Sequence, residues 1–130
     1  MFFYNISKFF EHPYREDLFV KINFIFSLLL NLVIWFILYW KLHPLSYSAE
    51  TNYGQIYLHY NIYFGIDNIG SWYEAFIIPI LGLFIILFNN LLAYIFYVRE
   101  KLLSYVLIFT QSFLQIVLFA AAIFLILLNI

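Results

Sequence analysis

The chain has 130 residues, of which 66% are hydrophobic, 25% aromatic and only 10% charged. Soluble domains carry about 25% charged residues, so this composition excludes a water-soluble globular domain and predicts a protein that lies in lipid. The net charge of −1 provides no basic surface for nucleic acid. The absence of cysteine excludes disulfides, thiolate metal sites and cysteine nucleophiles.

The first predicted element is a short amphipathic helix over residues 2–11. Its large apolar side chains recur at helical spacing, and its polar side chains fall on the other face. Such a helix is suited to lie on a membrane surface, and we expect it on the cytoplasmic leaflet. The sequence His12-Pro13 then ends it. The apolar residues are Phe2, Phe3, Ile6, Phe9 and Phe10.

The second predicted element is a transmembrane helix over residues 14–41. Residues 22–40 contain no charged side chain, and about 20 apolar residues suffice to cross the hydrocarbon core of a bilayer. Pro13 suits the first position of this helix, with Asp17 near the positive end of its dipole. Tyr47 stands where signal-peptide cleavage needs a small residue, so we expect a retained anchor.

Residues 42–74 form a long connection outside the membrane. Polar or tyrosine side chains alternate with apolar ones from residue 55 to residue 64, which predicts an extended strand with one apolar face. The flanking segments 51–54 and 65–70 have turn-like compositions. Because an isolated strand leaves its backbone unpaired, we expect it to pair with residues 45–49. This hairpin would pack its apolar face on the ends of the helices.

Two further transmembrane helices are predicted, over residues 75–98 and 101–130. A tight turn with the sequence VREK joins their uncharged runs. Five of the six Lys and Arg residues lie before the first uncharged run, residues 22–40, or in this turn, and cytoplasmic flanks carry the excess of basic residues. The sequence therefore predicts an all-α membrane protein with one three-span domain, a cytoplasmic N-terminus and an extracytoplasmic C-terminus.

Each predicted span carries a stripe of polar or small residues on one face. In lipid, amide side chains favour protein partners, and a hydrogen bond between helices contributes about 0.6–2 kcal/mol. We interpret the stripes as contacts that hold the three helices together or join copies of the protein; alternatively, they line a pore or a ligand site. Asn31 and Gln115 lie near mid-span, so we expect them to meet at similar depth. The stripe residues are Asn23, Ser27, Asn31, Gly82, Asn89, Ser104, Gln111 and Gln115.

The sequence predicts no enzymatic activity, cofactor or metal. The three uncharged runs lack the ionisable side chains that proton relays and ion pathways use. His43 and His59 share the long connection with acidic residues, but their spacing matches no zinc motif. Phosphate-binding loops and nucleophile elbows are also missing from the sequence.

The segment LHYNIYFGIDNIG, followed by Pro79 and Asn89, resembles the small membrane domain of SdpI-type bacterial immunity proteins. In that family a segment with the pattern P-x-H-[FWY]-N…G-x-x-D lies between the first two spans. The resemblance covers about residues 31–90. This chain lacks the family's proline before the histidine and has Tyr57-Leu58 there instead. The chain also resembles small three-span bacterial proteins without a known activity. The resemblance implies a location in the bacterial inner membrane and four candidate residues in the outer loop, namely His59, Asn61, Gly65 and Asp67.

Three functions follow as hypotheses. The first is an accessory or scaffold protein that acts through helix–helix contacts with itself or with a larger membrane partner. The alternative is an immunity or sensing protein whose outer loop binds a peptide or small ligand. A third is an oligomeric pore, which requires the polar stripes to face water. In each case the lipid bilayer is the surrounding medium, and nucleic acid is not a partner.

Overall fold

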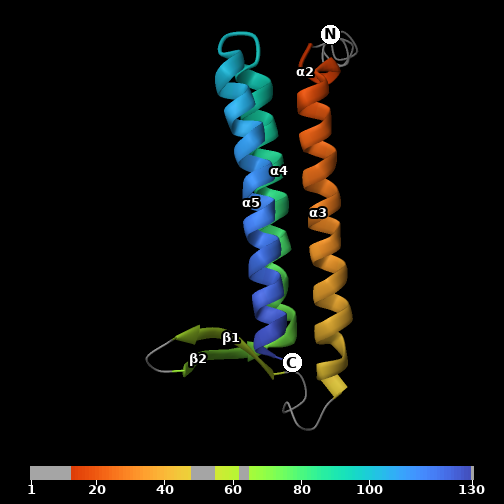
Figure 1. Cartoon of the computed structure of the whole chain (residues 1–130), viewed down its shortest axis with the longest axis vertical. Coiled ribbons are helices and arrows are strands. Elements are labelled where there is room, and N and C mark those ends of the chain that lie inside the picture. The colour runs from red at the N-terminus through yellow and green to blue at the C-terminus, as the bar shows by residue number, and fades with distance from the viewer. Residues whose placement is uncertain (1–12, 48–54, 62–64, 130) are drawn as a thin grey trace, which may run out of the picture.

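The computed structural model describes residues 13–47, 55–61 and 65–129, and it consists of three long helices and a small hairpin (Figure 1). The predicted amphipathic helix at residues 2–11 lies outside this part of the chain. In chain order the helical elements are α2 (Pro13–Glu16), α3 (Leu18–Leu42), the 3-10 helices η1 (His43–Tyr47) and η3 (Trp72–Phe76), α4 (Ile77–Phe96) and α5 (Lys101–Leu128). The strands are β1 (Gln55–Asn61) and β2 (Gly65–Ser71).

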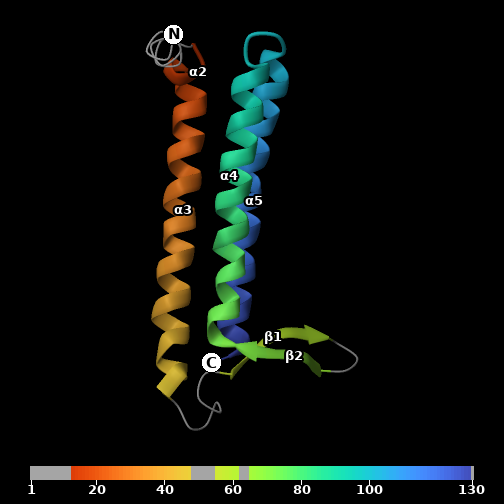
Figure 2. The same ribbon diagram turned by 180° about the vertical axis from the view of Figure 1, so that it is seen from behind.

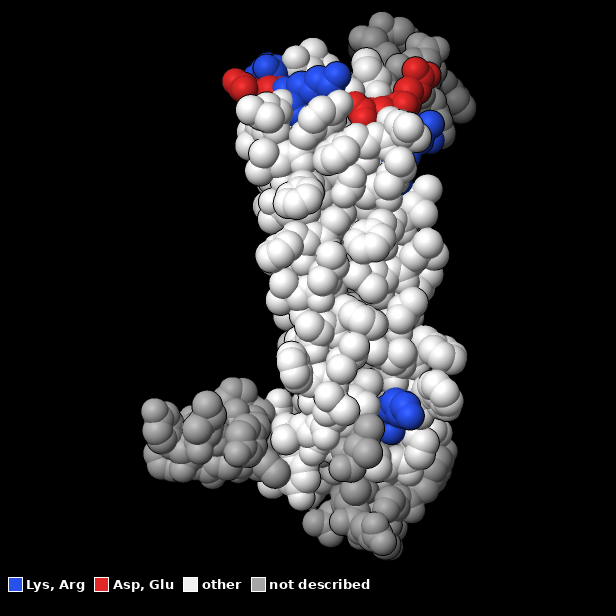
Figure 3. Space-filling model, viewed as in Figure 1, with Lys and Arg blue, Asp and Glu red and all other residues white. Residues whose placement is uncertain are grey.

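Three segments are long and apolar enough to cross a membrane, namely Leu18–Leu45, Trp72–Phe96 and Lys101–Leu128. In the view of Figure 3, the described charged residues gather beside α2 and at the α4–α5 turn, and a broad uncharged band separates them from Lys41 near the other end. Large apolar side chains cover the outside of that band, with Phe113 55% exposed and Leu87 70% exposed. These features confirm the predicted fold class, a multi-pass membrane protein with three spans.

The first helix differs from the prediction of one continuous helix over residues 14–41. The chain leaves helical geometry at Asp17, whose backbone is extended, and α3 then begins at Leu18. Asp17 is the N-cap of α3, because its carboxylate accepts hydrogen bonds from the backbone N–H groups of Phe19 and Val20. The second and third helices also differ slightly from their predicted bounds: a 3-10 turn precedes α4, and α5 ends at Leu128.

The three helices lie side by side along their whole length, with α5 in contact with both α3 and α4 (Figures 1 and 2). Two buried apolar clusters lie near the two ends of the bundle. The cluster at the end near α2 contains Tyr14, Val20, Ala93, Tyr97 and Ile108. The cluster near the hairpin contains Ile34, Leu38, Leu42, Ile56, Ala75, Ala122, Leu125 and Ile126. Between them, the interior is largely polar.

The hairpin exists, but its predicted pairing was wrong. β1 pairs with β2 in an antiparallel sheet, with Gln55 opposite Ser71 and Asn61 opposite Gly65. Residues 45–47 instead belong to η1, and residues 48–49 lie outside the described part of the chain. The segment 65–70, predicted as a turn, is therefore the second strand. As predicted, the face that carries Ile56 and Leu58 packs on the end of the bundle.

Candidate functional site

The candidate site is the buried polar layer, which we define as Ser27, Asn31, Gly82, Asn90, Gln111, Ser112 and Gln115. It lies between the two apolar clusters and takes residues from α3, α4 and α5. Asn31 is 1% exposed, and Gln111 and Gln115 are fully buried. Among the described residues, no buried side-chain nitrogen or oxygen lacks a hydrogen-bond partner. The layer is therefore satisfied within one chain.

At the centre of the layer, Asn31 and Gln115 connect all three helices. The Asn31 amide donates to the Gln115 side-chain oxygen at 3.3 Å and to the carbonyl of Pro79 at 3.0 Å. The Gln115 amide donates in turn to the carbonyl of Gly82 at 2.9 Å. A Cβ at Gly82 would clash with the Asn31 amide and lie 2.9 Å from the Gln115 oxygen. The absence of a side chain at Gly82 therefore lets the two amides meet.

Towards the α2 end, a second set of hydrogen bonds continues the layer. The Asn90 amide donates to the Gln111 oxygen at 2.5 Å, and the Gln111 amide donates to the Ser27 hydroxyl at 3.1 Å. Ser27 also shares a hydrogen bond of 3.2 Å with the hydroxyl of Ser112. Tyr14 extends the chain of contacts to α2, because its hydroxyl donates to the Asn90 oxygen at 2.6 Å. This set joins all three spans once more.

The remaining predicted stripe residues lie at the margins of the polar layer. Asn23 accepts a hydrogen bond of 2.8 Å from Ser112. Asn89 donates to the carbonyl of Leu107, and Ser104 donates to the carbonyl of Ala93. Asn89 and Ser104 thus join α4 to α5 through the backbone rather than through other stripe residues.

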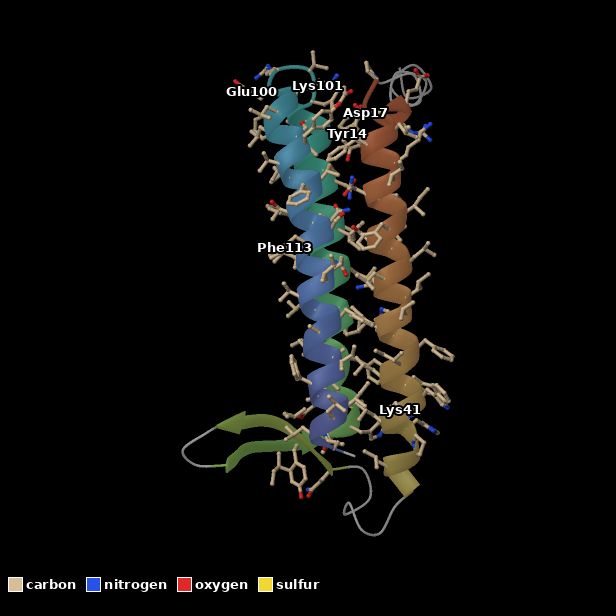
Figure 4. The ribbon with its side chains drawn as sticks, in the orientation of Figure 1. Tyr14, Asp17, Lys41, Glu100, Lys101 and Phe113 are labelled. Carbon is tan, nitrogen blue, oxygen red and sulfur yellow. The ribbon has the colours of Figure 1, made fainter. Side chains whose placement is uncertain are left out.

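Asp17 forms a separate cluster with two tyrosines at the α2 end, where Figure 4 shows it beside Tyr14. The hydroxyls of Tyr97 and Tyr105 donate to the same carboxylate oxygen at 2.6 and 2.5 Å. Burial raises the pKa of Asp17, but the hydrogen bonds from the two tyrosines and from the backbone outweigh it, so the pKa lies below its ordinary value. The hydrogen bond to Asp17, with burial, raises the pKa of Tyr97.

At the opposite end, Asn129 fastens the hairpin to α5. Its side-chain oxygen accepts from the backbone N–H of Tyr57 at 2.7 Å, and its amide donates to the carbonyl of Tyr57 at 2.8 Å. This pair of bonds imitates a neighbouring strand along β1. The same amide also donates to the carbonyl of Leu125 in the last turn of α5. The hairpin is therefore held at a fixed position relative to the bundle.

The four outer-loop candidates lie in the two strands of the hairpin. His59 and Asn61 belong to β1, and Gly65 and Asp67 belong to β2. The structure describes the backbone of these residues and not their side chains. Asn61 lies opposite Gly65, and His59 lies opposite Asn68 at an irregularity in the pairing. Their predicted role in binding a ligand stays a prediction.

Sequence reasoning missed several residues of the site. Ser112 lies off the line that the other α5 stripe residues share, and Tyr14, Tyr97 and Tyr105 resemble ordinary interface tyrosines. Asp17 did carry a signal, since an Asp directly before an apolar helical run is typical of an N-cap. Asn129 carried no such signal, because its hydrogen-bond partner is the backbone of Tyr57, which is far away in the sequence.

The described residues contain no group of three or more His, Cys, Asp or Glu side chains able to hold a metal ion. The hydrogen bonds of the polar layer join the helices to one another, which is a structural role. Comparison of the chain with known protein families, with curated proteins and with solved structures finds no match in any of the three.

Proposed function

We propose that this protein is a non-enzymatic membrane protein with an accessory or scaffold role, in which the hairpin contacts a second membrane protein. The observation that carries this proposal is the hairpin itself, which Asn129 holds across the end of the bundle. It projects sideways past α5 (Figures 1 and 2). Because Asn129 ties β1 to α5 at Tyr57, less conformational entropy is lost when the hairpin binds a partner.

The two faces of the hairpin differ in exposure. Ile56 and Leu58 pack against the bundle, whereas Tyr57 is 41% exposed and Ile69 is 56% exposed. Tyr57 and Ile69 lie opposite each other across the two strands and therefore share a face. An exposed aromatic–aliphatic pair is a typical anchor for a protein partner.

The buried polar layer supports the accessory role over an oligomeric pore. A pore needs the polar stripes to face water. Here Asn31, Gln111 and Gln115 are buried between the helices and form hydrogen bonds across them. Because these amides already have hydrogen-bond partners within the chain, the contacts also argue against a role in joining copies of the protein. The contact with a partner, either a second copy or a larger protein, is thus assigned to the hairpin.

The orientation we propose follows the basic residues. The α2 end carries Arg15 and Lys21, and the α4–α5 turn at the same end carries Arg99 and Lys101. Because cytoplasmic flanks are richer in Lys and Arg, this end lies in the cytoplasm and the hairpin lies outside. The resemblance to SdpI-type proteins supports the inner membrane of a bacterium as the location.

Site-specific photocrosslinking tests the proposed contact. With a benzophenone amino acid at position 57, we expect a discrete adduct whose mass identifies either a second 15.7 kDa copy or a larger protein. The same probe at Phe113, which lies mid-span on the outside of α5, is the matched control and should give no discrete protein adduct. Asn129→Ala should weaken the adduct at position 57, because the hairpin loses its attachment to α5.

The absence of an adduct at position 57 would contradict the proposal, as would the same adduct at both positions. A ligand-binding loop makes a different prediction. If the outer loop binds a peptide or small ligand, His59→Ala and Asp67→Ala remove the response of the cell to that ligand and leave the adduct unchanged.

A further inference from the structure

A groove of about 650 Å³ lies where α2, α3 and α4 meet, at the α2 end of the bundle. Val20, Phe24 and Leu91 provide an apolar part of its lining. The two basic residues Arg15 and Lys21 also contribute to its lining. A groove with an apolar part and two cations matches a molecule that has both a hydrocarbon tail and a negative charge.

The groove lies at the depth of lipid headgroups. Arg15 precedes the first membrane-spanning segment, which begins at Leu18, and Lys21 lies one turn inside it. On the facing helix, Tyr94 lies in the last turn before Phe96, where the second segment ends. Tyrosines prefer this interfacial region, and lysines near a helix end extend their ammonium groups towards it.

The charges around the groove favour an anion. Among the described residues, both charged residues that line it are basic. Asp17 lies two residues after Arg15, but its carboxylate accepts hydrogen bonds from Tyr97 and Tyr105. Glu16 is exposed and is not part of the described lining, and α4 contributes no charged residue between Ile77 and Phe96.

We propose that this groove binds one anionic phospholipid. The lipid phosphate lies against Arg15 and Lys21, and one acyl chain follows Val20, Phe24 and Leu91. The binding is independent of the hairpin contact proposed above, because the two surfaces lie at opposite ends of the bundle.

Native mass spectrometry of the full-length protein, released from bilayers of equal phosphatidylcholine and phosphatidylglycerol, tests the site. A basic residue near an anionic surface favours the anionic lipid by a factor of about five. We therefore expect a one-lipid adduct in which phosphatidylglycerol exceeds phosphatidylcholine by about tenfold or more. In the double variant Arg15→Gln/Lys21→Gln, the ratio should fall to near one.

The matched control is Arg99→Gln/Lys101→Gln, which removes the same charge from the same end but away from the groove. This variant should keep the lipid ratio within about twofold of the wild-type value. Leu91→Trp adds bulk to the lining without a change in charge and should reduce the amount of the adduct. Melting temperatures in the same detergent show whether each variant is folded.

Two results would overturn the proposal. An equal fall in the lipid ratio for both charge variants would assign the preference to the general charge of this end. A wild-type protein without any preference for phosphatidylglycerol would show that the groove does not select an anionic lipid.

Discussion

At the scale of single residues, Asp17 links the start of α3 to α4 and α5. Its carboxylate caps α3 and accepts hydrogen bonds from Tyr97 and Tyr105. The pKa of Asp17 is lower in the folded protein than its ordinary value. Asp17 therefore adds stability above its unfolded pKa, and this contribution is lost as the pH falls through the folded pKa. The raised pKa of Tyr97 acts in the opposite range, since its contribution is lost as the pH rises through the folded pKa.

Asp17→Asn tests this linkage, because asparagine also caps helices well and so isolates the loss of the charge. At pH 7 the variant should unfold at a lower temperature than the wild type, since charged hydrogen bonds to Tyr97 and Tyr105 become neutral ones. The difference should shrink as the pH falls below about 4, the ordinary range of an Asp pKa. Thermal unfolding in mild detergent at both pH values measures it. A difference that stays constant between pH 7 and pH 3 would show that the carboxylate charge is unimportant.

At the scale of the elements, the helices were predictable from the sequence because lipid imposes a simple rule of long uncharged runs. The polar faces were visible as well, because helical periodicity places Ser27 and Asn31 on one side. The hydrogen-bond partners of these residues could not be predicted. The pairing of Ser27 with Gln111, for example, depends on the depth and rotation at which two helices distant in sequence pack. The pairing of Asn31 with Gln115 could be predicted, because both residues lie near the middle of their spans.

The error in the hairpin has a physical explanation. The two glycines between residues 65 and 70 suggested a turn, but Gly70 lies within β2, opposite Ile56. A Cβ at Gly70 would clash with the Glu74 carboxylate and lie 2.5 Å from a methyl carbon of Leu58. Gly70 is therefore needed for close packing between the strand and η3. A glycine used for close approach and a glycine used for a turn look alike in a single sequence.

The hydrogen bond between Asn31 and Gln115 makes a prediction at this scale. A double-mutant cycle with Asn31→Leu and Gln115→Leu should give a coupling energy of about 0.6–2 kcal/mol in unfolding experiments in detergent micelles. The oligomeric state should not change, because the amides bond within one chain. Phe36→Leu with Phe113→Leu, two exposed positions on α3 and α5, is the control pair and should show no coupling. A change of oligomeric state without coupling would mean that the amides join copies of the protein.

At the scale of the whole molecule, the two ends of the bundle have different chemistry. One end holds four of the five described basic residues, the Asp17 cluster and the groove proposed for an anionic lipid. The other carries the hairpin, which Asn129 holds against the last turn of α5. The polar layer between them fixes the three helices in one arrangement. In a three-span arrangement these two ends lie on opposite sides of the membrane.

Cysteine labelling tests this claim most directly, because the natural chain contains no cysteine. Single cysteines replace Tyr57 in the hairpin, Glu100 in the α4–α5 turn and Phe113 on the outside of α5, without a change in the number of basic residues. A membrane-impermeant maleimide should label position 57 in intact cells, position 100 only after permeabilisation, and position 113 in neither case. Labelling of positions 57 and 100 from the same side of the membrane would contradict the three-span arrangement.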